Sequence, residues 1–270
     1  MFTKITLENF RSFDHIELDL TEKGNTAKHL AILYGENGAG KSNLMSAFVL
    51  LPELTRTMDA RAAYERILAQ GAIFQDENME KEMREHIRQR LRDMSAIIKD
   101  YQMADCENPI IAEYEFNIDG NNGCYRVEFG QDEILHERLE FVLNRRRGLY
   151  FDCSVTGINI NDSIVEKEQG KEFLTDVKEM AKRYWGKHSL LAILIYEMKD
   201  KSNSFGRDNI TENFNVVLNE FRNLSCTVSM GDKSWEGLHA QLKVLNQPLS
   251  GKISLKREHE LDQVEAFFSH

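Results

Sequence analysis

Hydrophobic residues along this chain change their spacing several times, and each spacing predicts a different kind of element. Apolar and polar residues alternate over 2–13 and again over 15–20, which is typical of two half-buried strands that pair through a short turn. A continuous apolar run over 30–34 predicts a buried strand, and residues spaced by three or four follow it from Leu44 to Leu51. The first part of the chain therefore predicts a hairpin, a buried strand and a helix.

Further along the chain the pattern is helical, then extended, then helical again. Helical spacing continues over 52–75, and a single apolar stripe over 76–105 predicts one long amphipathic helix. Four alternating runs separated by turn sequences over 109–165 predict an antiparallel meander, in which His136 and Glu137 are expected to be a surface pair rather than metal ligands. The remaining segments predict helices over 166–185, 213–221 and 259–268, a strand over 253–255, and a buried helix or strand over 188–196.

The turn after the buried strand carries the motif G-x-x-x-x-G-K-S. Glycines allow successive N–H groups to turn inward around phosphate oxygens, and the start of the following helix adds its positive end. Lys41 is placed to reach the β- and γ-phosphates, and the Ser42 hydroxyl is the natural ligand for a bridging Mg²⁺. The order strand, loop and helix therefore predicts a site for ATP and Mg²⁺, made of Gly35, Glu36, Asn37, Gly38, Ala39, Gly40, Lys41, Ser42 and Asn43.

The composition limits which partners the protein can bind and in which compartment it is expected. The 270 residues carry 34 Lys and Arg against 44 Asp and Glu, a net charge of −10, so any DNA contact would have to be local. Residues 145–147 form a compact arginine cluster, which could contact a phosphate backbone or could simply lie at a hairpin end. The chain shows no secretory signal and no apolar run of membrane length, which predicts a cytoplasmic protein without membrane contact. Four widely spaced cysteines indicate neither a zinc site nor a disulfide framework.

Two motifs in the first 43 residues together resemble a known family. The string L-x-N-F-R-S-F over 7–13 and the later GENGAGKSN over 35–43 resemble the ABC-type ATPase heads of the SMC, RecF and OLD families. More narrowly, they resemble the prokaryotic AAA-family ATPases of that clan, which are often linked to DNA repair or antiphage defence. The resemblance implies that Arg11 and Ser12 lie beside the bound nucleotide, and a plain surface turn is the alternative.

The resemblance also implies a fold class and a division of the chain. The fold would be an α/β P-loop NTPase, an ABC-type head with N-terminal strands, a helical insertion and an antiparallel β-lobe. Its parts would be a nucleotide-binding core over 1–75, the helical insertion over 76–108, the β-lobe over 109–165, and a helical and mixed α/β segment over 166–270.

Several groups that such a head uses cannot be assigned in this sequence. Tyr196 stands where the run over 188–196 would need a metal-binding aspartate, so Glu197 is not assigned as catalytic, and Lys252 breaks the likeness of 248–252 to the LSGG signature. The Q-loop glutamine could be Gln70, Gln75 or Gln102. We therefore expect the chain to be the N-terminal part of a longer ATPase, which binds ATP but does not hydrolyse it alone.

Two functions from different classes remain open. In the first, the heads form a homo-oligomer around sandwiched ATP, and their closure acts on DNA or on an effector protein such as a nuclease or a toxin. In the second, the chain is a nucleotide-gated scaffold or sensor that binds an effector and hydrolyses little or no ATP. A metal-dependent nuclease of the OLD type would need a C-terminal acidic cluster, which this sequence does not contain.

Overall fold

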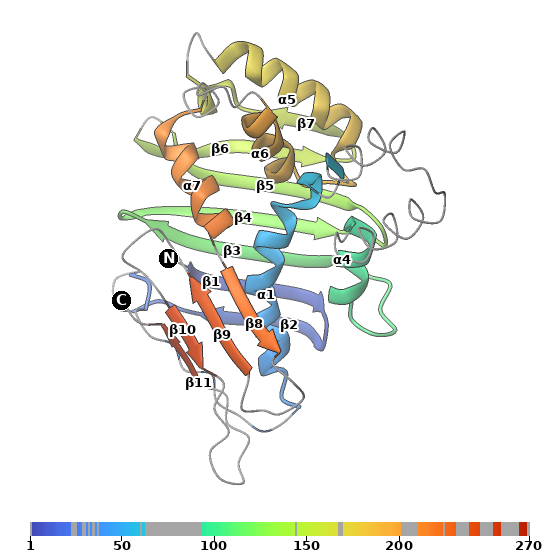
Figure 1. Cartoon of the computed structure of the whole chain (residues 1–270), viewed down its shortest axis with the longest axis vertical. Helices are drawn as coiled ribbons and strands as arrows, with labels where there is room; N and C mark the ends of the chain where they lie inside the picture. The colour runs from blue at the N-terminus through green and yellow to red at the C-terminus, as the bar shows by residue number, and fades with distance from the viewer. Residues whose placement is uncertain are drawn as a thin grey trace, which may run out of the picture.

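A seven-stranded antiparallel sheet forms the framework of the protein (Figure 1). The computed structural model describes residues 2–22, 26–28, 31, 33, 36, 38–59, 61, 62, 93–143, 145–166, 170–200, 210–223, 225–230, 238–243, 251–254 and 265–268. In the order β2-β1-β3-β4-β5-β6-β7, the strands are β2 (Phe13–Asp19), β1 (Phe2–Phe10), β3 (Ile110–Ile118), β4 (Asn121–Phe129), β5 (Ile134–Leu143), β6 (Arg146–Ser154) and β7 (Gly157–Ile160). The predicted hairpin and the predicted meander are both confirmed.

Strand β1 joins the hairpin and the meander into one sheet. It pairs with β2 on one side and with β3 on the other, so that Ile5 lies opposite Leu18 in one pair and opposite Tyr114 in the other. The N-terminal strands and the β-lobe therefore share a sheet, although the sequence assigned them to different parts of the chain. The division at residues 75, 108 and 165 stays a prediction.

The alternation along each strand gives the sheet one apolar face and one polar face. In β3, Tyr114 and its inward neighbours are buried, while Glu113 and Glu115 between them are only half-buried. Helices lie on the apolar side in Figure 1. They are α1 (Lys41–Leu54), α4 (Met94–Tyr101), α5 (Gly170–Tyr184), α6 (Leu190–Asp200) and α7 (Glu212–Asn223), with the short helix η2 (Asp162–Ile164) before α5. The mixed α/β class is therefore confirmed.

Helix α1 runs across the sheet and is fixed to it at mid-length (Figure 1). The stripe of apolar residues predicted from Leu44 to Leu51 is buried. The Tyr114 hydroxyl, reaching from β3, donates to the carbonyl oxygen of Ala47 at 2.6 Å. Because this bond is buried on both sides, it sets the position of α1 on the sheet as well as its orientation.

The prediction of unbroken helical structure over 52–75 is corrected at Thr55. Helix α1 ends at Leu54, and a turn at residues 55 and 56 separates it from a further helical turn at 57–59. The hydroxyls of Thr55 and Thr57 donate to the carbonyl oxygens of Pro52 and Leu54, at 2.9 and 3.3 Å. Such local bonds compete with continuation of the helix.

The other predicted helices have mixed outcomes. Helices α5 and α7 are confirmed, and the run over 188–196 is helical from Leu190 onward, in α6. The prediction of one long helix over 76–105 is wrong at the described residues, because α4 begins at Met94 after the extended N-cap residue Asp93 and ends at Tyr101. Residues 63–92 lie outside the described part of the chain. Among the described residues, no helix is long and apolar enough to cross a membrane.

A second, smaller sheet contains the C-terminal strands. Its order is β11-β10-β9-β8, with β8 (Ser225–Met230), β9 (Leu238–Lys243), β10 (Gly251–Ser254) and β11 (Glu265–Phe268). The predicted strand at 253–255 is confirmed at its first two residues, and the predicted helix over 259–268 is wrong at its end, where β11 pairs with β10. Pairing of this kind supplies main-chain hydrogen bonds that the periodicity of a short segment does not report. The signature-like residues 248–250 lie outside the described residues.

Candidate nucleotide-binding site

The described part of the predicted phosphate loop forms a tight turn that leads into α1. The main-chain N–H of Ala39 donates to the carbonyl oxygen of Glu36 at 3.2 Å, which closes the turn. Gly38 and Gly40 have φ values of 81° and 85°, a left-handed conformation that suits glycine. Gly35, Asn37 and most of the strand predicted over 30–34 lie outside the described residues.

Helix α1 begins without a capping side chain. Its N-cap residue is Gly40, which makes no side-chain cap, and the first turn contains no acidic residue. By contrast, Asp93 accepts from the N–H of Ala96 at 2.8 Å at the start of α4, and Ser189 accepts from Ala192 at 3.0 Å at the start of α6. The first N–H groups of any helix lack partners within the helix and carry partial positive charge, so this one is open to an anion from outside.

Two polar side chains complete the loop. The ammonium group of Lys41 donates to the carbonyl oxygen of Glu36 at 2.5 Å, so the side chain folds back over the loop. Ser42 is exposed at the next position of α1. These groups fit a triphosphate with Mg²⁺, because Lys41 brings a positive charge to the loop and Ser42 presents a hydroxyl beside it. Among the described residues no cluster of His, Cys, Asp and Glu could hold a metal ion by itself.

The turn between β1 and β2 lies beside this loop. Ser12 accepts a hydrogen bond from the side-chain amide of Asn43 at 2.8 Å, so two residues predicted to bind nucleotide pair with each other. Arg11 donates its main-chain N–H to the carbonyl oxygen of Tyr101 at 2.8 Å, and its guanidinium lies 5.0 Å from the centre of that ring. The turn therefore joins the start of α1 to the end of α4.

Of the three glutamines considered for a Q-loop, the structure describes only Gln102. It follows α4, pairs through its main chain with Phe10 at the end of β1, and donates its side-chain amide to the carbonyl oxygen of Cys106 at 2.8 Å. Gln102 thus lies next to the turn at residues 11 and 12. Gln70 and Gln75 lie outside the described residues.

Sequence reasoning missed the two aromatic residues that hold this region together. The Phe13 ring packs against Gly40, and the Tyr101 ring stacks on Phe10 with their centres 5.2 Å apart. Phe13 and Phe10 both belong to the string L-x-N-F-R-S-F, so the motif marked the region. No local pattern, however, links Phe13 to a glycine 27 positions later.

The family of the chain follows from a comparison over most of its length. The model of the AAA ATPase domain matches residues 1–223, which include the hairpin, the phosphate loop, the seven-stranded sheet and the helices through α7. The chain belongs to the AAA ATPase domain family. This AAA ATPase domain supports ATP binding and ATPase activity, and such domains generally bind ATP together with Mg²⁺. No curated protein and no solved structure matches the chain.

The segment over 188–196 does not supply the groups that would complete ATP hydrolysis in this AAA ATPase domain. The run over 188–196 leads into helix α6, so Tyr196 and Glu197 lie within a helix and not at the end of a strand. Glu197 is buried. The aspartate and glutamate that support Mg²⁺ and orient water in P-loop ATPases therefore have no counterpart in this segment.

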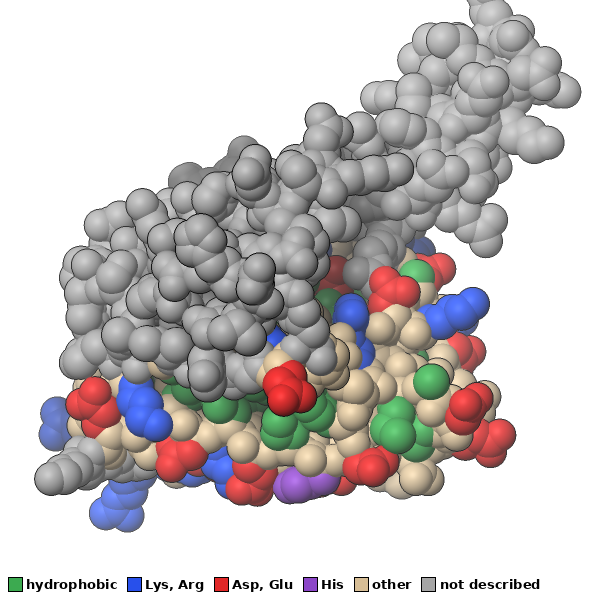
Figure 2. Space-filling view, turned by 90° about the horizontal axis from the view of Figure 1, so that it is seen from below, with side chains coloured by type: hydrophobic (Ala, Val, Ile, Leu, Met, Phe, Trp, Pro, Cys, Tyr) green, Lys and Arg blue, Asp and Glu red, His purple; other side chains and the backbone are tan. Residues whose placement is uncertain are grey.

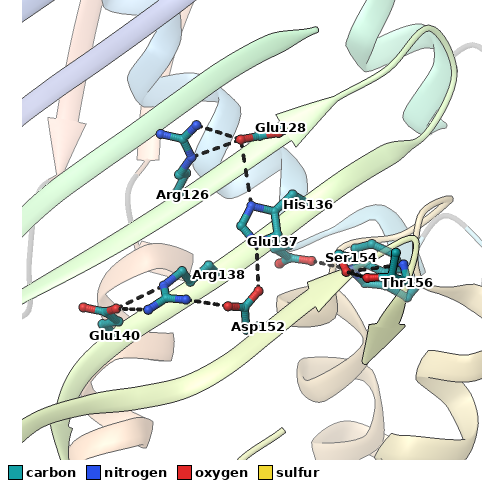
Figure 3. A network of polar contacts seen from close by, with 10 residues as sticks. Arg126, Glu128, His136, Glu137, Arg138, Glu140, Asp152, Ser154 and Thr156 are labelled. Atoms are coloured by element: carbon teal, nitrogen blue, oxygen red, sulfur yellow. Dashed lines mark hydrogen bonds and ion pairs between the residues drawn. The ribbon is translucent and has the colours of Figure 1, made fainter. Parts of the chain in front are cut away.

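The polar face of the sheet carries a network of compensated charges (Figure 3). Arg126 pairs with Glu128 at 2.7 Å, and Asp152 accepts from both His136 and Arg138. Burial acts to raise the pKa of Asp152, but the hydrogen bonds from His136 and Arg138 outweigh it and hold the pKa below its usual value. His136 thus belongs to an ion-pair network on this face.

One of the three arginines over 145–147 belongs to the same network. Arg147 pairs with Glu140 at 2.8 Å, and all three arginines are exposed where β5 connects with β6. In Figure 2 acidic and basic side chains are interspersed over the described part of the surface, and no continuous basic area appears on that part in this view. A contact of residues 145–147 with nucleic acid stays a prediction.

Proposed function

We propose that this chain is the ATP-binding part of an ABC-type head of the SMC, RecF and OLD kind, which works in the cytoplasm in DNA repair or antiphage defence. The uncapped and acid-free start of α1 carries the proposal. It follows directly on a glycine turn, with Lys41 and Ser42 at its first two positions. This combination suits a triphosphate. The N–H groups at the helix start, the helix dipole and the Lys41 ammonium group all favour the negative charge of the phosphates.

Each residue has a distinct role in this proposal. The N–H groups of Gly40, Lys41 and Ser42 would surround the phosphate oxygens, and the Lys41 ammonium would turn from the Glu36 carbonyl to the β- and γ-phosphates. The Ser42 hydroxyl would hold Mg²⁺, and the chemistry that this ion would supply is neutralisation of negative charge on the phosphates. Ser12 and Asn43 act as a pair at the edge of the site, in keeping with their hydrogen bond of 2.8 Å.

Head dimerisation would bring a second head over this site. The loop offers positive groups to the phosphates, while no aspartate or glutamate for hydrolysis is assigned beside it. In an ABC-type arrangement a second head covers the nucleotide, and its closure would act on DNA or on an effector protein. The motif L-x-N-F-R-S-F supports the ABC-type assignment of the site, because its Ser12 accepts a hydrogen bond from Asn43 in the first turn of α1.

A nucleotide-gated scaffold is the second candidate. The observation that favours it is the helical state of residues 190–200, because the segment closest in sequence to a metal-binding Walker B strand is not a strand. In that case ATP would assemble the chain with an effector protein, and little or no phosphate would be released.

Titration calorimetry with ATP and Mg²⁺ tests the site. Lys41→Ala should weaken ATP binding by about a hundredfold while the thermal unfolding of the free protein stays unchanged, since Lys41 contacts the loop and not the core. Lys99→Ala is the matched control, because Lys99 is an exposed lysine on α4. Equal ATP affinity of wild type and Lys41→Ala would refute the site.

Two further measurements separate the candidates. Light scattering with and without ATP should show an ATP-dependent increase in mass if heads dimerise. Phosphate release by the wild type and its absence in Lys41→Ala would support the ATPase, whereas ATP-dependent assembly without phosphate release would favour the scaffold.

A further inference from the structure

The residue that follows the β1–β2 turn packs directly against the phosphate loop. A Cβ atom built on Gly40 would lie 2.6 Å from Cζ and 2.9 Å from Cε1 of Phe13, and 3.1 Å from Oγ of Ser12. Distances this short mean that the Phe13 ring occupies the space that a side chain at position 40 would need. Gly40 is the N-cap of α1, so the ring contacts the point where the loop becomes a helix.

A hydrogen bond next to this ring fixes the same part of α1. Asn43 lies in the first turn of the helix, and its side-chain amide donates to Ser12 Oγ at 2.8 Å. Ser12 and Phe13 therefore hold two points of the helix start, Gly40 and Asn43. The N–H groups of Gly40, Lys41 and Ser42, at and between these points, are the ones that the proposed function assigns to phosphate oxygens.

The β1–β2 turn is itself held in place by the end of α4 and the residues that follow it. Asn9 and Arg11 have φ values of 52° and 53°, a conformation that side chains rarely adopt. The main chain holds it: Arg11 N–H donates to the Tyr101 carbonyl oxygen at 2.8 Å, and Met103 N–H donates to that of Asn9 at 3.2 Å. The Tyr101 ring stacks on Phe10 beside these bonds. A turn fixed in this way is a firm support for the loop.

We infer that Phe13 is a positioning residue for the triphosphate, which acts through Gly40. Its ring keeps Gly40 in the left-handed conformation with φ 85° and so directs the N–H groups at the start of α1 toward one point. This inference rests on the proposed nucleotide site. Phe13 and Ile16 lie on the same strand and both pack, partly buried, against the core, but of the two only Phe13 is among the atoms nearest Gly40.

Calorimetry with ATP and Mg²⁺, together with thermal unfolding of the free protein, tests the inference. Phe13→Leu should weaken ATP binding by about tenfold, since a small misplacement of preorganised donors has a large effect on an anion site. Ile16→Ala, the matched control, should bind ATP within about twofold of wild type while lowering the unfolding temperature at least as much as Phe13→Leu. ATP affinity of Phe13→Leu equal to that of wild type would overturn the inference.

A double-mutant cycle measures whether Phe13 and Gly40 affect ATP affinity jointly, which a purely structural role of Phe13 would not predict. Gly40→Ala should bind ATP much more weakly than wild type, because its new Cβ atom meets the Phe13 ring and because alanine is strained at φ 85°. In a Phe13→Ala background the same Gly40→Ala change should cost at least about fivefold less affinity, since the ring is gone. Additive losses would overturn the inference. If the folded wild type does not bind ATP, the proposed function fails first and the inference fails with it.

Discussion

Replacing Glu137 with Gln should remove a pH dependence of stability that the wild type shows between pH 4.5 and about 7. The Glu137 side chain is fully buried under α6. It accepts hydrogen bonds from the Tyr125 hydroxyl at 3.0 Å, from Trp185 Nε1 at 3.0 Å and from the N–H of Leu190 at 2.7 Å. Burial raises the pKa of this carboxyl to about 7, against the opposing effect of those hydrogen bonds.

The direction of the effect follows from proton binding. Between pH 4.5 and about 7 the folded chain keeps a proton on Glu137 that the unfolded chain has already released. The free energy of unfolding therefore decreases as the pH rises through this window, and becomes constant above it. One pKa unit corresponds to about 1.4 kcal/mol, so the rise from 4.5 to about 7 corresponds to roughly 3 kcal/mol of lost stability.

The Gln variant preserves the shape and the hydrogen bonds of the site. Its oxygen can accept from Trp185 Nε1 and from the N–H of Leu190, which are both donors only, while its NH₂ group donates to the Tyr125 oxygen once that hydroxyl has turned. The variant cannot ionise. Glu179→Gln is a suitable control, because it removes one negative charge from the exposed side of α5 and leaves the buried contacts intact.

Urea unfolding followed by circular dichroism measures the free energy at several pH values from about 5 to 8. The wild type minus Glu137→Gln difference should fall by about 2.5 kcal/mol over this range, whereas the difference between wild type and Glu179→Gln should stay constant. A constant difference for Glu137→Gln would show that the carboxyl does not change its ionisation in this window, and would refute the argument from burial.

Two other substitutions test the packing that positions α1 and the sheet, both by urea unfolding. Tyr114→Phe removes the buried hydrogen bond to the Ala47 carbonyl and should lower the free energy of unfolding by about 1 kcal/mol, and unchanged stability would show that this bond does not hold α1. Gly123→Ala places a Cβ atom 2.3 Å from two ring carbons of Phe116 and should cost about 2 kcal/mol, so a stable variant would show that the ring can move away.

Local patterns predicted the elements of this fold but not their contacts. The glycine motif located Gly40, Lys41 and the start of α1, because a phosphate loop is defined within eight residues. The pairing of β1 with β3 joins residues about a hundred positions apart, and the contact between Phe13 and Gly40 crosses 27 positions. Spacing along the chain carries no information about such contacts, which depend on how the completed elements pack.

Glu137 shows a different kind of failure, because its signal was present. The prediction that Glu137 is a surface partner of His136 is wrong, because Glu137 lies among the buried residues. Glu137, Leu139 and Phe141 occupy alternate positions of β5, so the period of two already put all three on the apolar face. The charge of the Glu137 side chain suggested exposure, whereas its position in β5 indicated burial. Position was the better guide, since donors from β4 and α6 and the indole of Trp185 surround the carboxylate.

The supports of α1 bear on how a nucleotide could act on this protein. Phe13 packs at the start of the helix, the Tyr114 hydroxyl holds its middle at Ala47, and at its end the Ser189 hydroxyl donates to the Leu54 carbonyl at 2.8 Å. A helix held at three points along its length can bind phosphate with little rearrangement, which favours affinity. The same supports oppose a sliding movement of α1 within the chain. A signal from bound ATP would then pass through a partner that the nucleotide recruits, as the proposed head dimerisation requires, and not through a shift of α1.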